Sequence, residues 1–295
     1  MRYFLDKNTL FIRGSFRAIS TRTAGRILPV GTLLIHTVTP KKKRIAPDKE
    51  LELIAAGAGI GPGYTGLFTT VPIQDLCVFQ YDFITVFITA AARAGSDMKD
   101  ADGQVSIIVC SGQGLTDAAL HETAEVATEA MAEAFRSPAG RKCLAPAGEI
   151  IIACEGAQEH SSAGPSSPVG SRVRAAILFG IAEAIQKQER QGTKKRPSFF
   201  IFSRFKGEHW TEWSPEDCPY YPCHFEGQRC DFCYCPLYPC NDEALGQWVE
   251  SSNGGKIWNC ARCTMIHEPA VADYLHKHPE ASKDELVRVW KSIKK

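Results

Sequence analysis

The sequence predicts an α/β fold, a mixed sheet covered by helices, followed by a small cysteine-rich metal-binding domain. Three observations predict this. Short apolar runs recur along the first two thirds of the chain, two longer segments carry apolar residues at helical spacing, and eight of the twelve cysteines crowd into the last third. The chain has 295 residues, of which 44% are hydrophobic, so it can bury a sizeable core in one large or two smaller domains.

The apolar runs predict buried strands. They are rich in β-branched and aromatic residues and are apolar at consecutive positions, which is typical of a sheet covered on both faces. The runs comprise residues 32–35, 83–88, 105–110, 150–154 and 199–202.

Two segments predict amphipathic helices. The first spans residues 117–135, with Thr116 as its N-cap, and its apolar residues fall on one stripe while its glutamates fall on the opposite face. The second spans residues 172–188, with Ser171 as its N-cap. A polar, basic stretch follows the second helix and leads into the last apolar run. We therefore expect a domain boundary near Phe205, giving domains 1–204 and 205–295.

The charge and the hydropathy exclude some classes of function. The formal net charge is only +1, so there is no overall attraction to nucleic acid or to an anionic membrane surface. From Phe205 onward, ten Lys/Arg stand against fourteen Asp/Glu, which argues against phosphate binding by the tail. No apolar run approaches the roughly 20 residues of a spanning helix, and the charged start does not resemble a secretion signal. We expect a cytoplasmic protein, whose oligomeric state the sequence does not indicate.

The cysteine cluster predicts a metal site. In a reducing compartment, closely spaced cysteines bind metal more often than they form disulfides, and zinc accepts four sulfur or nitrogen ligands. We expect two structural zinc ions, with an iron–sulfur cluster as the alternative; the division of the ligands between two sites is not readable. The predicted ligands are Cys218, Cys223, Cys230, Cys233, Cys235, Cys240, Cys260, Cys263 and His267. Because aliphatic residues are few here, we expect metal binding to supply much of the folding energy.

The four remaining cysteines are scattered through the first two thirds of the chain. Cys77, Cys110, Cys143 and Cys154 lie in or beside apolar segments. We expect them to be buried small hydrophobic residues.

Several short segments recur in an order that resembles a known family. They are Ser20 with Gly25, GLFTTVP from Gly66, VFITA from Val86, VSIIV from Val105, LTDAAL from Leu115 and ATEA from Ala127. From about residue 19 to residue 185, this order resembles the adenosylcobinamide amidohydrolase family of corrinoid salvage. The strings WSPEDCPYYPCH and CDFCYCPLYPC also resemble the cysteine-rich small domain known as a fused partner of that family.

The resemblance implies hydrolysis of the amide that joins aminopropanol to a propionyl side chain of the corrin ring. The product would be adenosylcobyric acid, so the corrinoid is the substrate and not a cofactor. Amide hydrolysis needs an activated nucleophile, an oxyanion stabiliser and an acid for the leaving amine. Our working hypothesis gives Glu129 the general acid/base role, with Ser20 as nucleophile or donor. Residues expected to bind substrate are Thr70, Thr89, Thr128 and Asp117.

The chain departs from the family pattern at three places. A Thr-Gly-Thr-Gly-Thr-Asp-like segment is replaced by residues 144–149, in which neither Asp nor Thr survives; Gly-Thr-Ile-Asn is replaced by residues 103–106; and a lysine is replaced by Met131. Two other interpretations therefore stay open. One is a corrinoid- or metal-handling protein without catalysis, and the other is a zinc-dependent hydrolase of another substrate.

Overall fold

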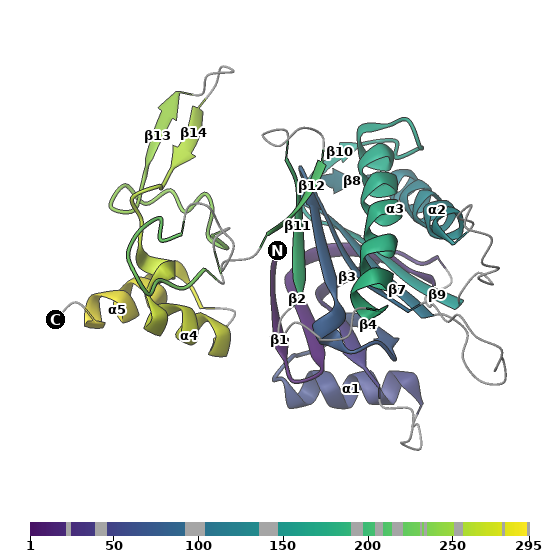
Figure 1. Ribbon diagram of the computed structural model, residues 1–295, viewed down its shortest axis with the longest axis horizontal. Helices are drawn as coiled ribbons and strands as arrows, with labels where there is room; N and C mark the ends of the chain where they lie inside the picture. The colour runs from purple at the N-terminus through teal and green to yellow at the C-terminus, as the bar shows by residue number, and fades with distance from the viewer. Residues whose placement is uncertain are drawn as a thin grey trace. The chain divides into compact units, whose positions relative to one another are not determined.

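The chain forms two compact units, Tyr3–Trp213 and Ser214–Lys295, in the computed structural model (Figure 1). The structure describes residues 1–21, 25–38, 46–91, 104–135, 147–189, 197–203, 209–213, 221–230, 232, 235–250, 256–278 and 281–293. Phe205, where we expected the domain boundary, lies outside these residues, as does Cys143.

The larger unit is built on a mixed sheet, which confirms the predicted fold class. Within the described residues the sheet has ten strands in the order β12-β11-β5-β6-β7-β9-β2-β3-β4, with β1 paired to β2. The strands are β1 Arg2–Asp6, β2 Thr9–Ser20, β3 Leu28–Thr37, β4 Tyr64–Thr69, β5 Cys77–Tyr81, β6 Ile84–Ala90, β7 Gln104–Ser111, β9 Ala147–Cys154, β11 Ser198–Ser203 and β12 His209–Trp213. The pairs β3–β4, β5–β11 and β7–β9 are parallel. Two short strands, β8 Gly114–Leu115 and β10 Gln158–His160, pair separately.

Both faces of the central strands are covered, as the continuous apolar runs predict. Ile107 and Ile150 belong to a core that includes residues of helices α2 (Asp117–Ala134) and α3 (Pro168–Glu189), which lie together on one face in Figure 1. Ile108 and Ile151, one residue further along each strand, belong to a second core on the other face, because successive side chains in a strand point to opposite faces.

The start of α2 is as predicted, whereas the start of α3 is not. Thr116 caps α2 by accepting a hydrogen bond from the Ala119 N–H at 3.2 Å. Helix α3 begins at Pro168, four residues before the predicted start, and the Gly170 N–H donates to Ser167 Oγ at 2.9 Å. The prediction of Ser171 as N-cap is therefore wrong. Proline is favoured in the first turn because its fixed φ suits a helix and its missing N–H would have no partner there.

A bulge in β2 changes the direction of the sheet. The register between β2 and β3 shifts between Arg13 and Phe16. Beyond the bulge β2 still pairs with β3, and its last four residues also pair with β9 on the opposite edge. Bulges bend the strand that contains them. At the end of the strand order, β4 packs against β7 and β9. Helix α1 (Pro47–Gly57) covers the outer side of β3 and β4.

The smaller unit combines a hairpin with short helices. The hairpin joins β13 (Gln247–Glu250) to β14 (Lys256–Asn259), and the helices are α4 (Pro269–Lys277) and α5 (Lys283–Ile293) (Figure 1). Its apolar core consists of Leu245, Met265, Ile266, Val271, Leu275, Ala281 and Leu286. Thus α4, α5 and the turn before them supply an aliphatic cluster beside the cysteines. In neither unit is any described helix both long and apolar enough to cross a membrane.

Candidate functional site

A row of polar side chains crosses three adjacent strands of the larger unit. Thr89 on β6 pairs in register with Ser106 on β7, and Ser106 pairs with Glu149 on β9. Residues at matching register positions present their side chains on the same face of a sheet. That face also carries Ile108 and Ile151, so it is the face opposite α2 and α3. We call Thr69, Thr89, Ser106 and Glu149 the polar row.

Thr69, at the end of β4, joins the row from a strand that is not hydrogen-bonded to the other three. Thr89 Oγ1 donates a hydrogen bond to Thr69 Oγ1 at 3.1 Å. Thr69 Oγ1 also accepts from the Val71 N–H at 3.1 Å, just beyond the strand. The two contacts hold the end of β4 over the row.

Phe68 provides the second link between β4 and the row. Its carbonyl accepts a hydrogen bond from Ser106 Oγ at 3.1 Å, and its N–H lies 3.4 Å from Glu149 Oε2. Backbone polar groups of a buried strand need partners. Side chains of β7 and β9 therefore satisfy the Phe68 backbone, where a further strand would otherwise do so.

Burial divides the polar row into two kinds of residue. The hydroxyl residues Thr69, Thr89 and Ser106 are fully buried, and each has a hydrogen-bond partner, as buried polar groups require. Glu149 is only partly buried. Of the row, it is the member with an ionisable group and access toward solvent.

Three of the residues predicted to act on the substrate lie at or near the row. Thr89 is part of it, and Thr70 follows Thr69 as an exposed residue. Ser20 is buried at the end of β2 and pairs with Ile151, which places it on the same face, two residues along β9 from Glu149. The structure thus brings Ser20, Thr70 and Thr89 to one region.

The structure does not bring Glu129 and Thr128 to that region. Both are exposed on α2, which packs on the opposite face of the sheet. The Thr128 hydroxyl donates to the Ala124 carbonyl one turn earlier, at 2.7 Å.

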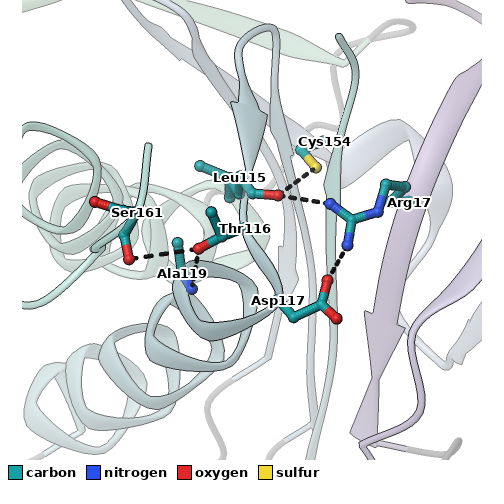
Figure 2. Close-up of polar contacts among 7 residues, drawn as sticks. All are labelled: Arg17, Leu115, Thr116, Asp117, Ala119, Cys154 and Ser161. Carbon is teal, nitrogen blue, oxygen red and sulfur yellow. Dashed lines mark hydrogen bonds and ion pairs between the residues drawn. The ribbon is translucent and has the colours of Figure 1, made fainter. Parts of the chain in front are cut away.

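Asp117 lies at yet another place, the start of α2 (Figure 2). Its carboxylate forms an ion pair with Arg17, whose Nη1 also donates to the Leu115 carbonyl at 2.7 Å. Arg17 pairs with Cys154 at the carboxyl end of β9, whereas Glu149 lies near the amino end of that strand. The Asp117 side chain is 71% exposed, so this contact fixes the start of the helix without burying a charge.

Sequence reasoning did not select Thr69, Ser106 or Glu149. Each is a single polar residue at the edge of, or inside, an apolar strand. Such an interruption on one face of a covered strand was the available signal, but only the register of the strands shows that the three meet.

In the smaller unit, one group of predicted ligands gathers around Gln228. Its Nε2 lies 3.2 Å from both Cys223 Sγ and Cys230 Sγ. The rings of His224 and His267 have their centroids 4.5 Å apart. The pKa of His224 is lowered, mainly by burial and to a smaller extent by the nearby His267. His267 Nδ1 lies 2.8 Å from the Arg229 carbonyl oxygen, a contact in which Nδ1–H donates, so Nε2 is the ring nitrogen that could bind a metal.

A second group contains the other four described cysteines. The Cys263 N–H donates to the Cys260 carbonyl at 2.9 Å, closing the turn of this CxxC pair. Cys235, Cys240 and Cys263 pack against the apolar core of the unit. The pKa of Cys235 is raised to about 11, mainly by burial, and the neighbouring Cys263, Cys260 and Cys240 thiols contribute to this rise.

The donors suit zinc, but the described atoms do not form a closed site. Thiolates and imidazoles are the ligands of structural zinc. Among the residues that the structure describes, no group of three or more His, Cys, Asp or Glu is arranged to hold an ion. Cys218 and Cys233, two of the predicted ligands, lie outside the described residues.

Comparison with known families matches the two units to two different descriptions. Residues 7–193 match "Adenosylcobinamide amidohydrolase", and residues 209–289 match "Cysteine-rich small domain". The chain is therefore an amidohydrolase with an attached cysteine-rich unit. It belongs to the adenosylcobinamide amidohydrolase family, because the first match spans more than half of its length. Both resemblances predicted from the sequence are confirmed.

Three curated relatives differ in how much they share with this chain. An uncharacterised protein of Methanocaldococcus jannaschii is 57% identical over 56 residues, which are 19% of this chain and 47% of that protein. The adenosylcobinamide amidohydrolase of Methanosarcina mazei is 28% identical over 196 residues, 63% of this chain and 98% of that protein. A "Probable cobalt-factor III C(17)-methyltransferase" of Methanothermobacter thermautotrophicus is 46% identical over 59 residues, 20% of this chain and 16% of that protein. Among solved structures no match was found.

Proposed function

We propose that the protein hydrolyses the aminopropanol amide of adenosylcobinamide, giving adenosylcobyric acid and aminopropanol. The observation that carries the proposal is the family match over residues 7–193, which includes the central strands and both long helices. The relative from Methanosarcina mazei supports it, since nearly its whole length aligns and its name is that of an amidohydrolase of adenosylcobinamide. The name of the relative from Methanothermobacter thermautotrophicus also refers to a cobalt factor.

We place substrate recognition where β2, β4 and the polar row meet. Thr70 is exposed directly after β4 and can donate or accept a hydrogen bond from an amide of the corrinoid. Thr89 is buried and bonded to Thr69, so it contributes by holding the end of β4. Ser20 lies on the same face as a donor. The roles of Glu129, Thr128 and Asp117 stay predictions.

The test of the proposal is direct turnover. Purified protein is incubated with adenosylcobinamide, and the corrinoids are separated by chromatography while aminopropanol is quantified. We expect adenosylcobyric acid and aminopropanol to form in equal amounts. Intact substrate that is nevertheless bound by folded protein would support a corrinoid-binding protein without catalysis. Turnover of a different amide, abolished by a chelator, would support a zinc-dependent hydrolase.

For the smaller unit we propose two structural zinc ions. The supporting observation is that its described ligands fall into two groups, one around Gln228 and one beside the apolar core. Zinc would supply no reaction step, because a structural ion with four protein ligands has no open position. Metal analysis of protein purified without oxygen tests this proposal. Iron with acid-labile sulfide, in place of zinc, would identify an iron–sulfur cluster.

A further inference from the structure

We propose that Glu149, and not Glu129, is the catalytic acid/base of this amidohydrolase. The inference rests on the proposed function and names the residue that moves the protons of that reaction. The observation that carries it is the polar row, in which Glu149 is the ionisable and partly exposed member.

The position of Glu149 is fixed by the strands around it. Its backbone is part of β9, in parallel register with β7. Its carboxylate faces the Phe68 N–H at 3.4 Å, and Ser106 holds the Phe68 carbonyl from the neighbouring strand. A proton-transfer group on a rigid strand, aligned by its neighbours, does not have to be reoriented during the reaction.

The hydroxyls of the row are poorly placed to move protons themselves. Thr69, Thr89 and Ser106 are fully buried and bonded to one another or to the β4 backbone. Their contacts instead fix the end of β4 beside the carboxylate. We assign them positioning roles and give the chemistry to Glu149.

The residues next to the polar row on this face of the sheet are apolar. On the same face of the same three strands, Phe87, Ile108 and Ile151 each lie two residues from a member of the row, and all are fully buried. A carboxylate at the border between this apolar surface and solvent can receive a proton from one water molecule without being surrounded by bulk water. Glu129, in contrast, is exposed on the opposite face of the sheet.

The proposed step is balanced with water as the co-reactant. Glu149 accepts a proton as the oxygen of a water molecule bonds to the amide carbon. The carbon–nitrogen bond then breaks, and Glu149 returns the proton to the departing nitrogen. The products are a carboxylic acid on the corrin side chain and free aminopropanol, and Glu149 ends in its starting state.

The Glu149→Gln variant tests this assignment because it removes the acid/base group but keeps an oxygen that can accept from Phe68. We expect kcat for aminopropanol release to fall by at least about 100-fold, within the range of general acid–base catalysis. Thermal stability should stay close to that of the wild type. The matched control is Glu125→Gln, an exposed glutamate on α2, which should release aminopropanol at the wild-type rate.

The outcomes separate the two proposals. If the wild type releases no aminopropanol, the proposed function itself fails. If the wild type is active and Glu149→Gln retains most of its kcat, the assignment of Glu149 is overturned. Loss of activity in Glu129→Gln together with an active Glu149→Gln would return the role to Glu129.

Glu149→Asp covers the case in which the Gln variant does not fold. It keeps the carboxylate but shortens the side chain by one methylene. We expect kcat to fall about tenfold with little change in KM, because the proton-transfer distance changes while substrate contacts do not. An unchanged kcat in a folded Glu149→Asp, with reduced stability, would indicate a purely structural carboxylate and contradict the inference.

Discussion

Thr89 on β6 donates a hydrogen bond to Thr69 at the end of β4 over 3.1 Å, although β4 and β6 are not neighbours in the sheet. Both side chains are fully buried. The contact is possible because β4 packs against β7 and β9, which brings its end close to the central strands. The formation of this buried hydroxyl pair therefore reports whether the end of β4 has packed against the central strands.

Replacing Thr89 with valine should destabilise the packing of β4 against the central strands. Valine has nearly the same shape but cannot donate to Thr69, so the free energy of unfolding should fall by about 1 kcal/mol. Thr89→Ser keeps the hydroxyl and serves as the control for the hydrogen bond. Urea denaturation of the three proteins gives the comparison. Equal stability of Thr89→Val and the wild type would show that the contact contributes nothing.

The start of α2 offers a second test on the larger unit. Thr116 accepts from the Ala119 N–H, so Thr116→Ala should lower the free energy of unfolding by about 1 kcal/mol, while Thr116→Ser should keep most of the wild-type stability.

The adjacent pair of Arg17 and Asp117 is largely exposed (Figure 2). For Asp117→Asn we expect the free energy of unfolding to fall by less than about 1 kcal/mol, and by still less at high salt concentration. A larger loss for Asp117→Asn than for Thr116→Ala would contradict this order.

The buried thiol of Cys77 predicts a pH dependence. Burial is the main cause that raises its pKa from 9.0 to about 12. Between these values the unfolded chain has released the proton while the folded chain keeps it, so folding stability falls as the pH rises through this window. Cys77→Ser, which removes the thiol, should lose less stability between about pH 8 and about pH 10 than the wild type does. Identical losses in both proteins, measured by urea denaturation at each pH, would refute this linkage.

The cysteines of the smaller unit should bind metal, unlike the buried cysteines of the sheet. Cys230→Ser and Cys263→Ser each remove one ligand from one of the two groups, so each should lower the zinc content by about one ion per chain. Cys154→Ser is the matched control, since Cys154 is a buried residue of β9. The measurements are zinc per chain and the protease sensitivity of the segment after Trp213. Full zinc content in both ligand variants would contradict the two-site proposal.

The strands of the sheet were predictable because burial on both faces forces apolar residues to be continuous. Each of the five predicted runs overlaps one observed strand: β3, β6, β7, β9 or β11. In contrast, β2 carries Arg13, Gly14 and Ser15 at its bulge, which interrupt the apolar pattern. Periodicity alone does not identify such a strand, since the bulge shifts its alternation in mid-strand.

The polar row was not predictable for a different reason. Ser106 and Glu149 are 43 residues apart in the sequence and meet only through the parallel register of β7 and β9. Which face a polar residue takes within a covered strand depends on that register and not on local composition. The acid/base prediction of Glu129, by comparison, rested on the family resemblance of the ATEA segment, and the structure shows Glu129 exposed on α2.

The most direct test of amide hydrolysis is the origin of the new carboxylate oxygen. Adenosylcobinamide is incubated with the protein in water labelled with heavy oxygen, and the corrinoid product is analysed by mass spectrometry. The proposed reaction predicts one labelled oxygen in adenosylcobyric acid for each aminopropanol released. Unlabelled product, or a corrinoid that stays intact in the presence of folded protein, would contradict it.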